Sequence, residues 1–271
     1  MATYLDEILR VHRAAAARDD RPVEDLAERA ASAGPTRGFV RSLRADEGLS
    51  VIAEVKRRSP SKGGLAEDLD PGELAVAYRS GGATCLSVLT DEQFFGGSVA
   101  DLAAARAASG LPVLRKDFTV CERDVLDARV MGADCVLLIV AALDDDELAA
   151  LSGLALRVGL DVLVEVHDEP EVARTLAAVA PGGDPDGPQV AIGVNQRDLV
   201  TFQVDSDRAV RVVDAIPADL VRVAESGVRG PADAGVLRAA GYDAVLVGEH
   251  LVTSGDPAAA ITALRSATPA D

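Results

Sequence analysis

Lysine is rare in this chain, and two of its lysines stand where apolar segments end. Of 27 basic residues, the three lysines are Lys56, Lys62 and Lys116. Lys116 follows the apolar start of LPVLRKDF (111–118), and Lys56 follows LSVIAEV (49–55). A desolvated lysine can lower its pKa and give up a proton, whereas arginine stays charged. We therefore expect acid–base chemistry at Lys56 and Lys116, while Lys62 is explained equally well as a solvated loop cation.

Carboxylates and other polar groups stand at the ends of further apolar segments. They are Glu54, Glu165, Asn195, Glu225 and Ser226. Glu54 lies two positions before Lys56, so these two side chains share one face of a strand. Charged side chains are seldom buried unless they are paired or used in function. A structural ion pair would account for any one of them, but several gathered at the ends of different strands favour a catalytic cluster.

Two glycine-containing turns indicate an anion site. ESGVRG (225–230) and VGEH (247–250) each place glycine just after an apolar run and before a helical pattern. Backbone N–H groups in such turns, with helix N-termini behind them, suit a phosphate group. Ordinary helix caps are the alternative. Ser59, in the loop after the first apolar run, could add a hydroxyl group from the other side.

The few aromatic residues are concentrated near the same ends. The chain has five phenylalanines, three tyrosines and no tryptophan. Phe94 and Phe95 follow the second apolar run, and Phe118 ends the third. Aromatic residues usually fill the core, but at one mouth they could enclose an aromatic ring. Arg197 could pair with a carboxylate there or cap a surface helix, and we expect Asp117 to form a buried ion pair or cap a loop.

Eight apolar runs supply the elements that must position these groups. The runs are 49–55, 85–90, 111–118, 135–141, 161–166, 190–195, 221–226 and 244–249. They are apolar throughout, as strands covered on both faces are. Alanine-rich segments of helical period separate them, with Pro, Ser or Asp at their starts and Gly at their ends. This alternation predicts an α/β fold, a (β/α)8 TIM barrel whose chemistry lies at the carboxyl ends of its strands.

A doubly wound open sheet is the competing fold. No GxGxxG follows the first strand, which disfavours it. We divide the chain into an N-terminal helical extension packed on the barrel (residues 1–48) and a barrel catalytic domain (49–271). The extension contains an amphipathic helix at about 3–18, and FVRSLR (39–44) forms another turn or short helix. The insert PGGDPDGPQ (181–189) is expected to be a surface loop on the face opposite the site.

Composition excludes several kinds of partner. The net charge is −17 and the sequence pI is about 4.5, which opposes nucleic acid and acidic membrane surfaces. No apolar run approaches the roughly 20 residues of a membrane span, and the N-terminus does not resemble a signal peptide. The cysteines and histidines lack metal-ligand spacing. We therefore expect a cytoplasmic protein without metal or cofactor, which must supply positive charge locally to any anionic ligand.

Taken together, these motifs resemble those of the indole-3-glycerol phosphate synthase family. The resemblance covers residues 50–250 in order, and LDEIL (5–9) is similar to the family's N-terminal helix, which helps to close the site. The segments that carry it are AEVKRRSPSKG, LSVLTDEQFFGGS, PVLRKDF, GADCVLLIVAAL, VLVEVHDE, IGVNQRDL, VAESGV and AVLVGE.

The resemblance implies a carboxy-lyase of tryptophan biosynthesis. Its substrate would be 1-(2-carboxyphenylamino)-1-deoxyribulose 5-phosphate, which is converted to indole-3-glycerol phosphate with loss of carbon dioxide and water. Lys116 would be the general acid toward the ribulose carbonyl and Glu165 its partner carboxylate. Lys56 and Glu54 would form a second acid–base pair. Asn195 and Glu225 would hold substrate hydroxyl groups; Ser226 completes the catalytic set.

The same resemblance implies the binding residues. The phosphate would be bound by Ser59, Ser226, Gly227 and Gly248, and the anthranilate ring would be lined by Phe95, Phe118, Arg197 and Leu199. Glu249 stands where some members have serine, so its backbone N–H rather than its side chain would face the phosphate. The assembly expected is a monomer or a weak homodimer.

Three other functions fit parts of the pattern. An aldolase that forms a Schiff base would also place a lysine at a strand end. Phosphoribosylanthranilate isomerase is a barrel of the same pathway, but its reaction does not evidently need two lysines at the mouth. A silent barrel that only binds a phosphorylated metabolite would have no reason to keep Glu54, Lys56, Lys116 and Glu165 together.

Overall fold

Eight parallel strands close into a barrel. We describe a computed structural model, which covers residues 3–46, 48–59, 63–180, 186–198 and 200–267. Each strand pairs with the strands before and after it along the barrel, and β1 pairs with both β4 and β10 to close the ring. The barrel strands are β1 (Ser50–Val55), β4 (Cys85–Leu89), β5 (Val113–Lys116), β6 (Cys135–Ile139), β7 (Asp161–Val166), β8 (Val190–Asn195), β9 (Val221–Glu225) and β10 (Ala244–Val247).

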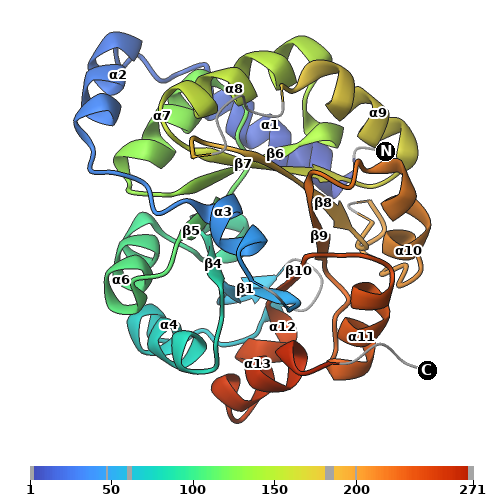
Figure 1. The fold of residues 1–271 in the computed structure, drawn as a ribbon. Helices are drawn as coiled ribbons and strands as arrows, with labels where there is room; N and C mark the ends of the chain where they lie inside the picture. Colours follow the sequence, from blue (N-terminus) through green and yellow to red (C-terminus); the bar gives the residue numbers. More distant parts are fainter. Residues whose placement is uncertain (1–2, 47, 60–62, 181–185, 199, 268–271) are drawn as a thin grey trace.

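Helices form a ring around these strands (Figure 1). After β1 come the short antiparallel strands β2 (Arg58–Ser59) and β3 (Gly63–Gly64). The outer helices are α4 (Pro71–Ser80), α5 (Glu92–Phe95), α6 (Val99–Ser109), α7 (Glu122–Val130), α8 (Asp145–Arg157), α9 (Glu169–Ala178), α10 (Arg208–Val212), α11 (Pro231–Ala239), α12 (Glu249–Val252) and α13 (Pro257–Arg265), with 3-10 turns η1 (Val140–Ala142) and η2 (Val213–Ala215).

The predicted (β/α)8 barrel is confirmed, and local chemistry explains its regularity. All residues of β1, β4, β6, β7, β8 and β10 are buried, as expected for strands covered on both faces. The helix boundaries follow their capping residues. Asp70 accepts a hydrogen bond from the Glu73 N–H at the start of α4, and Gly110, with φ 72°, ends α6.

Three helices precede the barrel, and they reach both of its ends. The expected first helix is α1 (Tyr4–Ala16), and FVRSLR forms α3 (Phe39–Arg44). The helix α2 (Val23–Ser32) was not predicted; it packs against α7 through Leu26 and Ala30. Its N-cap is Pro22, which makes no side-chain capping bond, so the usual start signal is absent.

The helix α3 closes the end of the barrel where the strands begin. Phe39, Val40 and Leu43 are at most 1% exposed, and α3 contacts β4, β7 and β9. The Val40 N–H donates to Asp161 Oδ2 over 2.8 Å, at the first residue of β7. Because an unpaired N–H at a helix start is costly to bury, this bond helps to fix α3 in place.

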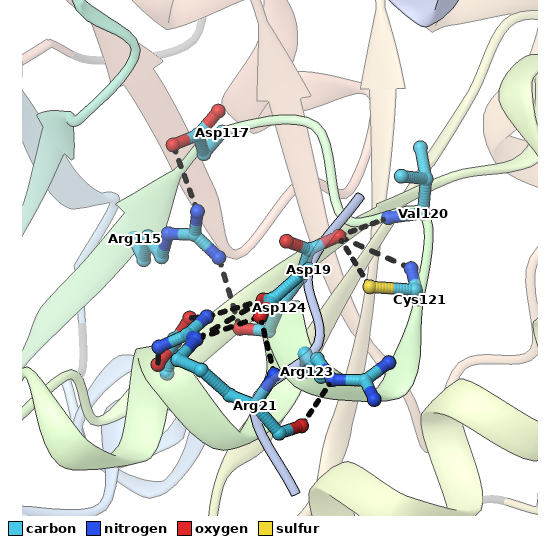
Figure 2. Close-up of polar contacts among 9 residues, drawn as sticks. Asp19, Arg21, Arg115, Asp117, Val120, Cys121, Arg123 and Asp124 are labelled. Atoms are coloured by element: carbon cyan, nitrogen blue, oxygen red, sulfur yellow. Dashed lines mark hydrogen bonds and ion pairs between the residues drawn. The ribbon is translucent and has the colours of Figure 1, made fainter. Parts of the chain in front are cut away.

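The segment between α1 and α2 is fastened to α7. Arg21 donates to Asp19 Oδ2 over 2.6 Å and to Asp127 Oδ2 over 2.7 Å. The Arg21 carbonyl oxygen accepts a hydrogen bond from Arg123 Nε over 2.8 Å, which Figure 2 shows beside this pair. Bidentate arginine–carboxylate pairs have a defined geometry, so the linker has a fixed path along the barrel.

The described end of the insert before β8, residues 186–189, lies at the strand-start end of the barrel. Residues 181–185 of the insert fall outside the described part of the chain. The Gln189 N–H donates to Asp161 Oδ1 over 2.7 Å at the start of β7, far from the strand ends that carry Glu165 and Asn195.

Among the described residues, no helix combines the length and the apolar character needed to cross a membrane.

Replacing Phe39 with alanine should weaken the closed end of the barrel. Deletion of a fully buried phenylalanine side chain is expected to lower the free energy of unfolding by about 3–5 kcal/mol, measured by denaturant titration. Val76→Ala is the control: it removes an apolar side chain that is 50% exposed on α4. It should change the free energy of unfolding by less than about 0.5 kcal/mol. A loss below about 1 kcal/mol for Phe39→Ala would contradict the role of α3 as a packed plug.

Candidate active site

A cavity of about 660 Å³ opens at the carboxyl ends of the strands. Its floor consists of polar side chains from β1, β5, β7, β8 and β9. Its walls are the loops that follow these strands, and α1 lies over it through Tyr4, Leu5 and Ile8. The cavity therefore occupies the place where barrel enzymes carry their chemistry.

Lys116 lies at the centre of the floor between two glutamates. Its Nζ is 2.7 Å from Glu165 Oε2 and 3.1 Å from Glu225 Oε2. Burial alone would lower the pKa of Lys116, but the negative charges of Glu165, Glu225 and Glu54 outweigh burial and raise it well above the ordinary value. The expectation of a lowered lysine pKa was therefore wrong for Lys116. The surrounding carboxylates, contributed by distant strands, hold it as an ammonium ion.

The two glutamates beside Lys116 are not equivalent. Burial raises the pKa of both, and Lys116 lowers both. For Glu165 the charge of His167 and a hydrogen bond from Asn195 Nδ2 (2.9 Å) add to that lowering, giving a pKa of about 2. For Glu225 the repulsion by Glu165 and Glu54 adds to burial and brings the pKa to about 7. The geometry thus favours an ionised Glu165 beside a Glu225 that readily takes up a proton.

A second charge pair lies at the end of β1. Lys56 Nζ donates to Glu54 Oε1, and the Glu54 backbone carbonyl accepts from Tyr78 Oη over 3.0 Å. Gly248, after β10, lies directly against this pair. A Cβ built on Gly248 would overlap Glu54 Oε1 and lie 3.1 Å from Lys56 Nζ. Only a residue without a side chain leaves the pair in this position.

The turn after β5 is fixed by an ion pair beneath Lys116. Figure 2 shows Arg115 between the Asp117 carboxylate and the Asp124 backbone carbonyl. Arg115 Nη2 is 3.0 Å from Asp117 Oδ2, and Arg115 Nη1 donates to the Asp124 oxygen over 2.9 Å. Asp117 Oδ1 also accepts the Phe118 N–H over 2.8 Å. Asp117 therefore forms both the buried ion pair and the loop cap that were the two expectations for it.

Aromatic side chains form one side of the cavity. The rings of Phe95 and Phe118 lie 6.4 Å apart. Tyr4 of α1 makes edge-to-face contacts with Phe94 and Phe202, with ring centroids 5.8 Å and 5.2 Å apart. Tyr4 and Phe202 were not among the predicted site residues. The signal for Tyr4 was its place beside the LDEIL segment, whereas Phe202 lies in an irregular loop with no periodic signal.

Tight turns form the opposite side. Ser226 and Gly227, with φ 65° and 76°, turn the chain sharply after β9. The Ser226 carbonyl oxygen accepts from Gln196 Nε2 over 2.7 Å, which fixes the turn from a neighbouring strand. Gly248 and Glu249 face the same space from the end of β10. The turn predicted as an anion site therefore lies across the cavity from the aromatic wall.

The structure brings nearly all predicted site residues to this one cavity. Those that line it are Glu54, Lys56, Phe95, Lys116, Phe118, Glu165, Asn195, Arg197, Glu225, Ser226, Gly227, Gly248 and Glu249. Arg197 directs Nη1 to the Phe202 carbonyl oxygen at 3.0 Å. Ser59 belongs to β2, but its side chain lies outside the described part of the structure, as do Leu199 and Lys62.

Within the described chain, one histidine–carboxylate group has the spacing of metal ligands. It consists of His12, Asp91 and Asp117, whose ligand atoms lie within 4.8 Å of one another. Asp117 is already paired with Arg115, and Asp91 caps α5 through the Phe94 N–H. His12 Nε2 lies 2.9 Å from Asp91 Oδ2. The group is therefore better explained as the contact that holds α1 over the cavity.

Comparisons with known proteins agree with this geometry. The model of the indole-3-glycerol phosphate synthase family matches residues 5–264. Indole-3-glycerol phosphate synthase 1 of Streptomyces coelicolor is 51% identical, over 98% of this chain and 96% of that protein. The indole-3-glycerol phosphate synthase of Mycolicibacterium smegmatis is 48% identical, over 98% of this chain and 95% of that protein. The synthase of Rhodococcus jostii is 47% identical, over 98% of this chain and 96% of that protein.

Solved structures of low identity share the fold. Thiamine phosphate pyrophosphorylase from Pyrococcus furiosus aligns with a TM-score of 0.58 at 15% identity, over 83% of this chain and 95% of that one. N-acetylmannosamine-6-phosphate 2-epimerase from Clostridium perfringens aligns with a TM-score of 0.59 at 12% identity, over 81% and 93%. The family match spans almost the whole chain, so the chain belongs to the indole-3-glycerol phosphate synthase family.

Proposed function

We propose that this barrel closes the indole ring of indole-3-glycerol phosphate in tryptophan biosynthesis. The substrate is 1-(2-carboxyphenylamino)-1-deoxyribulose 5-phosphate, and the enzyme is a carboxy-lyase. One observation carries the proposal. The ammonium of Lys116 is held between Glu165 and Glu225, on the floor of a cavity with an aromatic wall on one side and tight turns on the other. A substrate with an aromatic ring at one end and a phosphate at the other fits that order.

The two ends of the cavity suit the two ends of the substrate. Phe95 and Phe118 can pack against the anthranilate ring, and Arg197 also lines the cavity; Leu199, which the family resemblance assigns to that end, lies outside the described residues. At the other end the turns at Ser226, Gly227, Gly248 and Glu249 present backbone N–H groups for the phosphate. The molecule has a net charge of −17, so these local donors and Lys56 must offset its repulsion of an anionic substrate.

Ring closure begins at the ribulose carbonyl. The ring carbon that bears the carboxylate attacks the carbonyl carbon, and the carbonyl oxygen takes a proton from Lys116. The raised pKa of Lys116 keeps it charged before the reaction. As the oxygen becomes an alkoxide it becomes more basic than the ammonium, so the proton passes to it during bond formation.

Two bond cleavages complete the conversion. The carbon–carboxylate bond breaks, carbon dioxide leaves, and its electron pair restores the aromatic ring. The new hydroxyl group then departs as water with a proton from an acid, and a base removes a proton from the neighbouring carbon to give the indole. Glu165 is suited to act as that base because it is ionised. Lys56 and Glu54 supply the second acid–base pair for the carboxylate and the departing hydroxyl.

Glu225 and Asn195 would orient the substrate. Glu225 takes up a proton more readily than an ordinary carboxyl group, so it can donate a hydrogen bond to a substrate hydroxyl. Asn195 Nδ2 already fixes Glu165. The extension, residues 1–48, serves as the roof at one end through α1 and as the plug at the other through α3.

Lysine Schiff-base chemistry is the rival use of the same residue. Borohydride added with substrate would reduce an imine to a stable amine and add the substrate mass to Lys116. We expect no such adduct by mass spectrometry. An adduct on Lys116 would replace the mechanism above with covalent catalysis.

Replacing Lys116 should abolish turnover without unfolding the barrel. Loss of a general acid typically costs about 10²–10⁴-fold in rate, so Lys116→Ala should lower kcat by at least about 10²-fold in an indole-fluorescence assay. Lys116→Arg keeps the charge but not a transferable proton, and should also be impaired. Arg18→Ala removes an exposed cation of the extension and should leave kcat unchanged. Near-normal kcat in Lys116→Ala would contradict the mechanism.

Gly248→Ala should displace the Glu54–Lys56 pair. Its Cβ would occupy the space of Glu54 Oε1, and misplacing a catalytic group by about 1 Å can cost roughly 10²-fold. We expect a loss of kcat/KM of that order with an unchanged thermal unfolding midpoint. Gly255→Ala is the matched control, because a Cβ there meets no atom within 4 Å. Equal activity of the two variants would show that the glycine does not protect the pair.

A further inference from the structure

His167 lies behind the catalytic cluster with one ring nitrogen directed at it. It follows β7, two residues after Glu165, and its Nε2 is 3.8 Å from Glu165 Oε1. That nitrogen is buried and has no hydrogen-bond partner among the described residues. At 3.8 Å the two atoms are beyond hydrogen-bonding distance. Any effect of His167 on Glu165 in this state is therefore one of charge.

The other side of the ring is held by Glu171 of α9. Glu171 Oε2 lies 3.1 Å from His167 Nδ1 and accepts the His167 backbone N–H over 2.7 Å. Glu171 is in turn placed by the start of α9, where its N–H donates to Asp168 Oδ1 over 2.9 Å. With Nδ1–H donating to Glu171, the ring orientation is set and Nε2 must face Glu165.

Three charged groups face the ring. Glu165 comes from β7, Glu171 from α9, and Arg208 from α10. Burial lowers the pKa of His167, but the bond to Glu171 and the charges of Glu165 and Glu171 outweigh burial and Arg208, so the pKa is raised. The Arg208 Nη1 is occupied with the Asn195 carbonyl oxygen at 3.0 Å. Two carboxylates against one guanidinium favour the imidazolium form.

The need for a second cation arises when Lys116 gives up its proton. Glu165 then loses its nearest positive charge while remaining buried, and Asn195 is its other side-chain hydrogen-bond partner in the described part of the chain. A buried carboxylate without a cation is costly and tends to take up a proton. Glu225 in the same cluster shows how strong this tendency is: even with Lys116 Nζ 3.1 Å from its Oε2, burial and the repulsion by Glu165 raise its pKa, and its Oε1 is buried without a hydrogen-bond partner in the described chain.

We propose that His167, held as an imidazolium by Glu171, is a positioning residue that keeps Glu165 ionised and in place while Lys116 protonates the substrate. This inference rests on the proposed acid–base roles of Lys116 and Glu165. The ring does not touch the reacting atoms; it acts through Glu165. Its charge offsets part of the negative field around Lys116, so it also makes proton release from Lys116 less costly.

The pH dependence of the chemical step tests this role. His167→Gln should slow single-turnover product formation about tenfold at pH 6.5, the equivalent of one pKa unit of charge stabilisation at Glu165 in the state where Lys116 has given up its proton, and leave KM within about twofold. The wild-type advantage requires the imidazolium. It should therefore persist above the ordinary histidine pKa and close as the pH rises through the raised value, where the wild type also loses the charge.

Glu171→Gln is the more discriminating variant. Its amide oxygen can still accept both His167 hydrogen bonds, but the negative charge that supports the imidazolium is gone. The pH at which the wild-type advantage is lost should move downward, and the nitrogen-15 resonances of the His167 ring should titrate at a correspondingly lower pH. Glu169 is exposed on the same helix. Glu169→Gln should leave unchanged both the pH at which the rate advantage is lost and the pH at which the His167 ring titrates.

The outcomes separate this inference from the function on which it rests. A rate ratio between wild type and His167→Gln that stays constant with pH, or a Glu171→Gln profile identical to that of the wild type, would overturn the positioning role. Glu165→Gln tests the underlying assignment: if it keeps full activity, the proposed role of Glu165 is wrong. If Glu165→Gln is inactive and the His167 profile is flat, only the present inference fails.

Discussion

The burial of opposite charges at one end of the barrel is the constraint on which the remaining structure depends. Three glutamates and two lysines meet there, and Glu54, Glu165 and Glu225 are each at most 4% exposed. Such charges are tolerated only when each has a partner at short range. Lys116 forms ion pairs with Glu165 and Glu225, and Lys56 forms one with Glu54. The cluster is therefore a set in which the state of each group depends on the others.

A closed barrel satisfies this constraint because it brings strand ends from the whole chain to one ring. Lys116 and its two glutamates are 49 and 109 residues apart in sequence, yet each sits at the end of its own strand. Further contacts fix the turns that carry these groups. Arg115 and Asp117 fix the turn that carries Lys116, and Gln196 fixes the turn at Ser226. The rigid surroundings are what give the charges a defined geometry.

The parts that were predictable depend on local pattern. Uninterrupted apolar runs predicted all eight strands, and residue types at their ends predicted most of the residues that line the cavity. The properties that were missed depend on contacts between distant segments. The helix α2 lacks a start signal and is held by α7. The pKa of Lys116 was expected in the wrong direction because its sign is decided by carboxylates from other strands. Phe202 reaches the cavity from a loop that has no periodicity.

The N-terminal extension touches the barrel at both ends, and this has a consequence for how the protein can change. The α1 helix lines the cavity through Tyr4, Leu5 and Ile8, whereas α3 fills the opposite opening with Phe39, Val40 and Leu43. Between them Arg21 fastens the linker to α7. We therefore expect substitutions in α1 to change substrate binding and product release, and substitutions in α3 to change thermal stability. The extension therefore contributes to the cavity with one segment and to the packed core with another.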